Sequence, residues 1–301
     1  MGIRLIASDM DGTLLDRHSD VSEANIRAIQ ALDEYGVEFI ICSGRDYGGA
    51  KALLESKGIK CGFICLSGAA VYDREGKRLL EIPMARQDVA DAETVLLSRG
   101  ATMKFMTSGG WYSTSKREAV LDELCRHWNG GIADPGRLPP LLRERVEERM
   151  DSITFIRHSS EIPSQVSVYK ICADDLAEET VMEIKDEFQA YAELAVASSF
   201  PTNIEVTGKN AQKGLALKYY AGRKQIPLED VMVLGDSDND LSMFTQDFGW
   251  TVAMSNSMPC ILEAARYRTL SNEEDGVAWA IRTYVFGETD WGNESENGLG
   301  K

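Results

Sequence analysis

The start of the chain alternates short, mostly apolar runs with amphipathic segments, and this alternation limits the possible folds more than any other feature. The runs cover residues 3–8, 37–42 and 63–66, and each has the length of a strand. Segments 22–35 and 46–57 lie between them and have the spacing of helices. Parallel strands in one sheet need a crossover connection, usually a helix. The pattern therefore predicts an α/β fold in which helices cover both faces of a parallel sheet.

The same alternation returns in the C-terminal part of the chain. Strands are expected at residues 231–234 and 251–253, and helices at residues 211–221, at residues 276–285 and from Asp238. Segments of the same kind at both ends of the chain fit into one sheet. We therefore expect a Rossmann-like parallel-sheet core that is built from residues 1–83 and 198–301.

An inserted α+β domain is expected between the two parts of the core. From residue 84 to residue 197, strand candidates are mixed with polar helices. Both boundaries fall in short polar stretches that contain a proline, E-I-P-M-A-R and S-S-F-P-T-N, as expected of linkers. The polar, glycine-rich end of the chain, from about residue 287, is predicted to be a disordered tail.

Charge and hydropathy exclude several classes of partner. The chain carries 32 Lys and Arg against 48 Asp and Glu, a formal net charge of -16, and it has no basic run that would attract nucleic acid or an anionic membrane. Its apolar runs end far short of the roughly 20 residues of a membrane span. The N-terminal sequence reaches acidic residues too early for a signal peptide, so we predict a cytoplasmic protein.

The first cluster of polar residues, D-M-D-G-T-L-L, directly follows the first apolar run. Its two carboxylates, Asp9 and Asp11, are separated by one residue, so in an extended segment they share a face. Gly12 then allows a sharp turn away from the sheet. Taken alone, a D-x-D pattern is more often a solvated acidic turn than a catalytic site.

Two further clusters carry groups that suit an anion. C-S-G-R-D places Ser43 and Gly44 after the second apolar run, and the helix expected to begin near Asp46 would offer unpaired backbone N–H groups. Q-K-G-L-A-L places Lys213 in the first turn of a helix, where its charge opposes the helix dipole unless an anion or carboxylates lie beside it. On their own, a Ser-Gly pair is usually a turn and a single lysine is usually solvated.

The fourth cluster, G-D-S-D-N-D, follows the apolar run V-M-V-L. It contains Asp236, Asn239 and Asp240, and its carboxylates repel one another unless solvent or a cation neutralises them. A calcium-binding EF-hand loop is excluded. Such a loop beginning at Asp236 would need Gly and Glu at positions where this chain has Leu241 and Asp247.

Three of these clusters come immediately after an apolar strand, so in a parallel sheet we expect them at the same edge. Carboxylates, one lysine and a hydroxyl with free amides can together hold a divalent cation and a phosphate. Oxygen ligands favour Mg²⁺ over zinc, and none of the three histidines lies in a cluster. The six cysteines form no C-x-x-C pair, and most of them are expected to be reduced.

In this order and strand context, the four clusters resemble the motifs of the haloacid dehalogenase superfamily of phosphohydrolases. Three further segments, S-G-A-A-V, V-A-M-S-N and S-N-E-E-D-G-V-A, are similar to the Cof-type branch of that superfamily. The resemblance implies that the inserted domain is a cap between the second and third motifs, which reads the substrate and excludes water. Ser43 and Ser67 depart mildly from the family pattern, in which Thr and Asn are common.

The resemblance also implies a role for each site residue. Asp9 would be the nucleophile that forms an aspartyl-phosphate, and Asp11 would act first as general acid and then as general base. The metal would be held by Asp9, by Asp11 through its backbone carbonyl and by Asp236, with Asp240 as a supporting residue. The implied phosphate-binding residues are Ser43, Gly44, Lys213 and Asn239.

We therefore expect a Mg²⁺-dependent phosphatase that acts on a small phosphorylated metabolite such as a sugar phosphate. Asp11 favours phosphate esters, because hydrolysis of a phosphoenzyme needs both an acid and a base. Two enzymes with the same expected core stay open: a phosphatase of the sucrose-phosphate or mannosylglycerate type, and a phosphomutase. A sensor that binds a phosphorylated ligand without turnover is a further alternative, whereas a nuclease is disfavoured by the missing basic patch.

The substrate and the oligomeric state stay open at this point. Four aromatic residues of the inserted domain are candidates for stacking on a sugar, although such residues are more often part of a core. They are Trp111, Tyr112, Trp128 and Tyr169.

Overall fold

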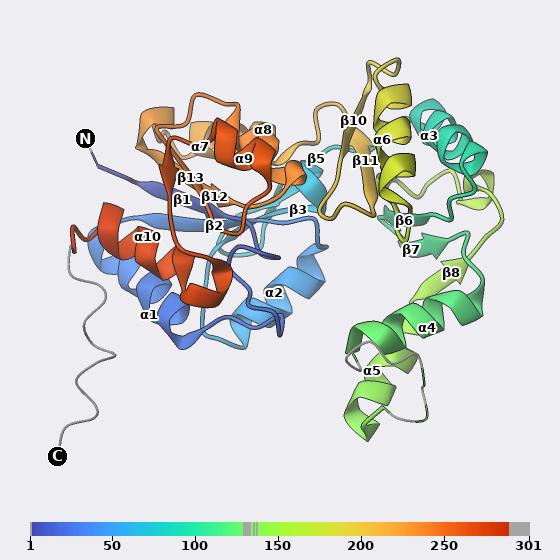
Figure 1. Cartoon of the computed structure of the whole chain (residues 1–301), viewed down its shortest axis with the longest axis horizontal. Coiled ribbons are helices and arrows are strands. Elements are labelled where there is room, and N and C mark those ends of the chain that lie inside the picture. The colour runs from blue at the N-terminus through green and yellow to red at the C-terminus, as the bar shows by residue number, and fades with distance from the viewer. Residues whose placement is uncertain (1, 129–133, 135, 137, 289–301) are drawn as a thin grey trace. The chain divides into compact units, whose positions relative to one another are not determined.

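The structure is a computed structural model that describes residues 2–128, 134, 136 and 138–288 of the 301-residue chain. The chain divides into two compact units, which we call the core unit (Met1–Glu81 with Asn210–Lys301) and the inserted unit (Ile82–Lys209). Each unit has its own sheet and its own apolar core, and Figure 1 labels most of the elements of both. Within the described ranges, no helix is long and apolar enough to cross a bilayer.

The core unit is built on an eight-stranded sheet with the strand order β14-β13-β12-β1-β2-β3-β4-β5. Its parallel strands are β1 (Leu5–Ser8), β2 (Glu38–Cys42), β3 (Gly62–Cys65), β12 (Val231–Gly235), β13 (Trp250–Ala253) and β14 (Tyr267–Arg268). Strands β4 (Ala70–Tyr72) and β5 (Arg78–Glu81) extend one edge in antiparallel pairing. The expected α/β fold is confirmed, and the antiparallel edge is an addition to it.

Helices cover both faces of this sheet, as Figure 1 shows. One face carries α1 (Glu23–Ala31), α2 (Tyr47–Glu55) and α10 (Gly276–Tyr284), and the other carries α7 (Lys213–Arg223), α8 (Leu241–Phe244) and α9 (Pro259–Ala264). Side-chain caps explain two of the helix starts. Ser22 Oγ accepts a hydrogen bond from the Asn25 N–H at 3.1 Å, and Asp46 Oδ1 accepts one from the Gly49 N–H at 2.8 Å.

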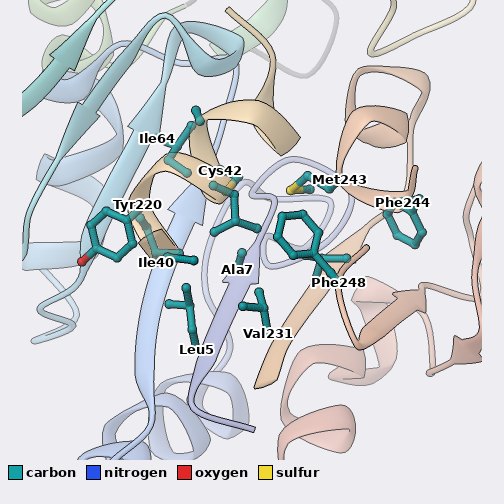
Figure 2. Packing of buried hydrophobic residues seen from close by; sticks show 14 of the residues in the cluster. Leu5, Ala7, Ile40, Cys42, Ile64, Tyr220, Val231, Met243, Phe244 and Phe248 are labelled. Carbon is teal, nitrogen blue, oxygen red and sulfur yellow. The ribbon is translucent and has the colours of Figure 1, made fainter. Parts of the chain in front are cut away.

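A buried apolar cluster fills the space between the sheet and helices α7 and α8. Figure 2 shows Leu5 and Ala7 of β1 beside Val231 of β12, with Met243 and Phe248 packed above them. These five side chains have no exposed surface. Burying a large apolar side chain stabilises the fold by about 1.5–3 kcal/mol relative to leaving it exposed. The cluster therefore holds in place the strands whose carboxyl ends carry the polar residues.

The inserted unit is built on a second, mostly antiparallel sheet with the strand order β10-β11-β9-β6-β7-β8. Its strands are β6 (Lys104–Thr107), β7 (Gly110–Ser113), β8 (Ile153–Phe155), β9 (Val168–Ala173), β10 (Leu194–Ala197) and β11 (Ile204–Gly208). Helices α3 (Arg86–Ser98) and α6 (Glu178–Phe188) share a buried cluster with one face of the sheet. Helices α4 (Arg117–Trp128) and α5 (Pro140–Asp151) form a smaller cluster with β8.

The aromatic candidates for sugar stacking lie in different surroundings. Tyr112 belongs to the buried cluster with α3 and α6, and Tyr169 is buried as well. The Trp111 ring lies 3.6 Å from the guanidinium carbon of Arg149. The side chain of Trp128 lies outside the part of the chain whose side chains are described. Tyr112 is therefore a core residue of the inserted unit.

The structure corrects the predicted boundaries of the inserted domain. The inserted unit spans Ile82–Lys209 instead of residues 84–197. The second boundary moves because β11 pairs with β9 and β10 of the inserted sheet. The proline-containing stretch S-S-F-P-T-N is therefore the connection between β10 and β11 and not a linker. Most of the tail predicted from about residue 287 lies outside the described residues.

Candidate active site at the carboxyl edge of the sheet

The adjacent strands β12, β1 and β2 end in the polar residues that the motifs singled out. Asp236 follows β12, Asp9 follows β1, and Ser43 and Gly44 follow β2. Because these strands are parallel neighbours, their carboxyl ends lie at one edge of the sheet. Lys213, the first residue of α7, reaches the same edge.

Lys213 lies at the centre of the site. Its Nζ is 2.7 Å from Asp9 Oδ1, 2.6 Å from Asp240 Oδ1 and 3.0 Å from Asn239 Oδ1. Burial by itself favours the neutral amine, but Asp240 and Asp9 outweigh it and hold the pKa of Lys213 above its ordinary value. The same carboxylates offset the unfavourable position of a cation at the start of a helix.

Asp9, Asp236 and Asp240 each offer a carboxylate oxygen within 4.8 Å of the others. Burial, followed by the charge of Asp240, raises the pKa of Asp9 well above its ordinary range. The same two causes raise the pKa of Asp236 to about 7. A divalent cation would relieve this repulsion, and the donors are oxygens of the kind that Mg²⁺ takes. The residues therefore fit a magnesium site.

Asp240 differs from the other two carboxylates because both of its oxygens have partners within the core unit. Oδ1 binds Lys213, and Oδ2 accepts hydrogen bonds from the backbone N–H groups of Asp236 at 2.9 Å and Ser237 at 3.1 Å. The short 3-10 turn at Asp238–Asp240 folds this carboxylate back over the start of the turn. This geometry suits a residue that orients Lys213 and the Asp236 backbone.

A sharp turn at Gly12 brings the D-M-D-G-T segment against Asp236. Gly12 has a φ of +82°, and a Cβ at this position would lie 2.4 Å from Asp236 Oδ2, so glycine is required. Thr13 Oγ1 donates to Asp236 Oδ1 at 2.7 Å, and Asn256 Nδ2 donates to the Gly12 carbonyl at 2.8 Å. In the sequence, residue type alone does not identify Thr13 or Asn256 as site residues, although both belong to segments that resemble the family.

Asp11 pairs with a residue to which the motifs gave no role, Arg45. The Asp11 carboxylate accepts from Arg45 Nε at 2.8 Å and from Arg45 Nη2 at 2.5 Å, which makes a two-point ion pair. The Asp11 and Arg45 side chains are 39% and 31% exposed, so the carboxylate is oriented and still accessible. The hydrogen bonds to Asp11 raise the pKa of Arg45. The only signal for this pair in the sequence is the arginine of C-S-G-R.

The segment after β2 is linked to the start of α7. Ser43 is fully buried, its Oγ accepts from the Arg45 N–H at 3.1 Å, and its carbonyl accepts from the Ser67 N–H at 3.0 Å. Ser67 belongs to the S-G-A-A-V segment and has a φ of +57°. Next to it, Gly68 approaches Gln212 so closely that a Cβ would lie 2.4 Å from the Gln212 carbonyl carbon. This contact fixes the S-G-A-A-V loop beside the first residues of α7.

Known proteins resemble this chain over nearly its whole length. The family model described as haloacid dehalogenase-like hydrolase matches residues 6–281. The chain belongs to this family. One similar relative is Phosphatase YwpJ of Bacillus subtilis (strain 168), which is 30% identical over 93% of this chain and 99% of its own. Another, from the same organism, is the 5-amino-6-(5-phospho-D-ribitylamino)uracil phosphatase YwtE. It is 30% identical over 95% of this chain and 99% of its own.

A solved structure of a haloacid dehalogenase-like hydrolase from B. subtilis is 29% identical, with a TM-score of 0.79 over 93% of this chain and 99% of that one. The expected superfamily, and with it the expected enzyme class of phosphatase, is confirmed. In this haloacid dehalogenase-like hydrolase, the structure joins Asp9, Lys213 and Asp240 by direct contacts. Asp11 and Ser43 lie at the same edge of the sheet, and Arg45 contacts both.

Proposed function

We propose that this protein is a Mg²⁺-dependent phosphatase that hydrolyses a small phosphorylated metabolite through an aspartyl-phosphate on Asp9. The observation that carries the proposal is the buried contact between Asp9 and Lys213 at the end of β1, inside a group of carboxylates. An anionic nucleophile approaches an anionic phosphate ester only where cations offset the charge. Lys213 is such a cation, and Asp240 holds it in place from the other side.

The proposed reaction has two halves. In the first, an oxygen of Asp9 attacks phosphorus, the bond from phosphorus to the leaving oxygen breaks, and protonated Asp11 gives its proton to that oxygen. In the second, the Asp11 carboxylate takes a proton from water, the water oxygen attacks phosphorus, and the bond to Asp9 breaks, which releases phosphate. The residues proposed to hold the phosphate oxygens are Ser43, Gly44, Lys213 and Asn239.

The residues proposed to hold Mg²⁺ are Asp9 and Asp236, together with the backbone carbonyl of Asp11. Bound there, Mg²⁺ would neutralise charge on the phosphate oxygens in the transition state. In the second half, where Asp11 is ionised and acts as the base, Arg45 would keep its carboxylate in one orientation through the two hydrogen bonds. The raised pKa values of Asp9 and Asp236 mean that protons compete with a cation for these carboxylates.

Asp11→Asn is expected to lower kcat by about 10²- to 10⁴-fold, because an amide is neither the acid nor the base that the two halves need. Asp9 can still attack in this variant, so phosphorylated protein should accumulate where its hydrolysis is the slower step. Acid-quenched single turnovers with a labelled ester measure both quantities. The control is Asp247→Asn, which changes an exposed carboxylate. A wild-type rate in Asp11→Asn would remove Asp11 from the mechanism.

Mg²⁺ is expected to stabilise the protein more at about pH 8 than at about pH 5.5. The pKa of Asp236 rises from 3.8 to about 7 on folding, so over this window the folded protein binds a proton that the unfolded chain has lost. The metal-free protein therefore loses stability as the pH rises through this window, and Mg²⁺ on the deprotonated carboxylates offsets the loss. Thermal unfolding with Mg²⁺ and with EDTA measures the effect. Equal stabilisation at both pH values, or an unaltered difference in Asp236→Asn, would contradict the metal assignment.

Phosphorylated metabolites that contain a sugar or a sugar alcohol are the proposed substrate class. The relatives YwtE and YcsE of Bacillus subtilis (strain 168) are named as phosphatases of 5-amino-6-(5-phospho-D-ribitylamino)uracil. We also propose that the inserted unit is the cap that selects among such substrates, and that the protein acts in the cytoplasm.

The decisive test is a screen of the purified protein with Mg²⁺ against a panel of phosphorylated metabolites, with detection of free phosphate. Release of phosphate supports the proposal. A phosphomutase would leave the phosphate on an isomerised product, and a sensor would bind a member of the panel without turnover. Either of these results would overturn the proposed hydrolysis.

A further inference from the structure

The short connection between β13 and α9 contacts both of the chain segments that carry the proposed metal ligands. We call this connection, residues 254–258, the bridging loop. It includes the end of V-A-M-S-N, a segment that resembles the Cof-type branch and has no role in the proposed mechanism. One of the two contacted segments follows β1 and contains Asp11 and Gly12, and the other follows β12 and contains Asp236. All of these residues belong to the core unit.

The bridging loop is fixed to the end of β12 by backbone contacts. The Met258 N–H donates to the Asp236 carbonyl at 2.7 Å. Ser257, which is buried, donates from Oγ to the Gly235 carbonyl at 3.1 Å. The backbone that carries the Asp236 carboxylate and the bridging loop are therefore held together.

Asn256 joins the bridging loop to the segment that follows β1. Its Nδ2 donates to the Gly12 carbonyl at 2.8 Å, and its Oδ1 accepts from the backbone N–H of Asn272 at 3.1 Å. Because one end of this amide must donate and the other must accept, both contacts fix the same orientation of the side chain. Asn256 therefore connects the Gly12 turn, through the bridging loop, to the backbone of Asp236.

This connection has a consequence for the proposed metal ligands. The Asp11 carbonyl is bonded to the Gly12 nitrogen, so it lies one peptide before the carbonyl that Asn256 holds. On the other side of Gly12, Thr13 Oγ1 donates to Asp236 Oδ1 at 2.7 Å. Thr13 thus links the turn to the side chain of Asp236, and Asn256 links it to the backbone. Asn256 is exposed, so water can replace its hydrogen bond at a small cost in stability, but water does not fix the spacing of two segments.

We propose that Asn256 is a positioning residue, which holds the Asp11 carbonyl and Asp236 at a spacing that suits Mg²⁺. The inference rests on the proposed function, which supplies these two ligands. Mg²⁺ takes oxygen ligands at about 2.0–2.1 Å in a regular octahedron, whereas Ca²⁺ takes them at about 2.3–2.6 Å in flexible geometry. A site whose two segments move apart loses more affinity for the smaller ion. Asn256 therefore favours Mg²⁺ over Ca²⁺.

The test measures the dissociation constants of Mg²⁺ and Ca²⁺ for the full-length protein by calorimetric titration. In Asn256→Ala, the dissociation constant for Mg²⁺ should rise by about three- to tenfold, the equivalent of one lost hydrogen bond. The dissociation constant for Ca²⁺ should change by less than about twofold, because its coordination tolerates the looser spacing. At saturating Mg²⁺, kcat for nitrophenyl phosphate should return to within about twofold of the wild-type value, since Asn256 acts through the metal ligands.

The matched control is Asn272→Ala. Asn272 Nδ2 donates to the Leu15 carbonyl at 2.8 Å, so this variant loses a hydrogen bond of the same kind and length, three residues beyond Gly12. It keeps the backbone N–H that orients Asn256. Both variants should lower the thermal unfolding midpoint of the metal-free protein by similar, small amounts, but only Asn256→Ala should change the ratio of the two dissociation constants. This comparison separates the positioning of ligands from a general contribution to stability.

The outcomes separate this inference from the function on which it rests. If the wild-type protein does not bind Mg²⁺, the metal site fails and the inference fails with it. If it binds Mg²⁺ but releases no phosphate, the proposed hydrolysis is overturned, and a changed ratio in Asn256→Ala still supports the inference. If the ratio in Asn256→Ala equals that of the wild-type protein, or if Asn272→Ala changes the ratio as much, only the inference is overturned.

Discussion

Asp9→Asn should reduce the release of phosphate by about 10⁴-fold or more, because an amide does not attack phosphorus. The fold should survive the change. Burial and the charge of Asp240 raise the pKa of Asp9, so an ionised carboxylate at this position opposes folding instead of supporting it. Lys213 would keep its contact with Asp240 in this variant.

Phosphate release from nitrophenyl phosphate with Mg²⁺ measures the loss of activity in Asp9→Asn, and thermal unfolding measures whether its fold survives. After an acid quench, the variant should carry no labelled phosphate, in contrast to the phosphoenzyme expected from Asp11→Asn. Asp247→Asn, at an exposed aspartate, is the control and should behave as the wild-type protein does. Substantial turnover by a folded Asp9→Asn protein would show that another group is the nucleophile.

Lys213→Met should abolish activity and also destabilise the metal-free protein, by about 3–5 kcal/mol. Lys213 is a cation that contacts both Asp9 and Asp240, and its side chain is fully buried. Its loss leaves two buried carboxylates facing each other with Asp236 close by. Mg²⁺ should restore part of the stability, because it neutralises the same carboxylates, but not the activity.

The control for this variant is Lys218→Met on the same helix, α7. Lys218 is exposed, so its loss should change the free energy of unfolding by less than about 0.5 kcal/mol. Urea unfolding with and without Mg²⁺ measures both variants. A Lys213→Met protein as stable as Lys218→Met in the absence of Mg²⁺ would mean that Asp9 and Asp240 do not depend on this ammonium.

In the core unit, the strands and helices lie close to the positions that the local sequence pattern predicts. The runs expected as strands at residues 37–42 and 231–234 are strands at Glu38–Cys42 and Val231–Gly235. The helix expected at residues 276–285 spans Gly276–Tyr284. Such agreement has a simple cause, since strands that are buried on both faces must be continuously apolar and the helices between them must be amphipathic.

In the inserted unit, the structure agrees less well with what the local sequence pattern predicts. The stretch S-S-F-P-T-N has the composition of a linker, but it connects β10 and β11 of one sheet. A proline in a polar stretch signals the end of a strand, and it does not distinguish a turn from a domain boundary. That distinction depends on which strand pairs with Ile204–Gly208, and pairing partners are not encoded in a local pattern.

The sequence by itself determined the fold class of the core and the positions at which its strands end. Parallel strands end at a common edge, so the places of Asp9, Ser43 and Asp236 could be inferred from the pattern alone. Only the tertiary structure decided which side chains pair there. Lys213 reaches Asp9 across 204 positions of the chain, and Arg45 reaches Asp11 across 34. Contacts of this kind, and the pKa values that follow from burial, depend on strand register and on close approaches such as that of Gly12 to Asp236.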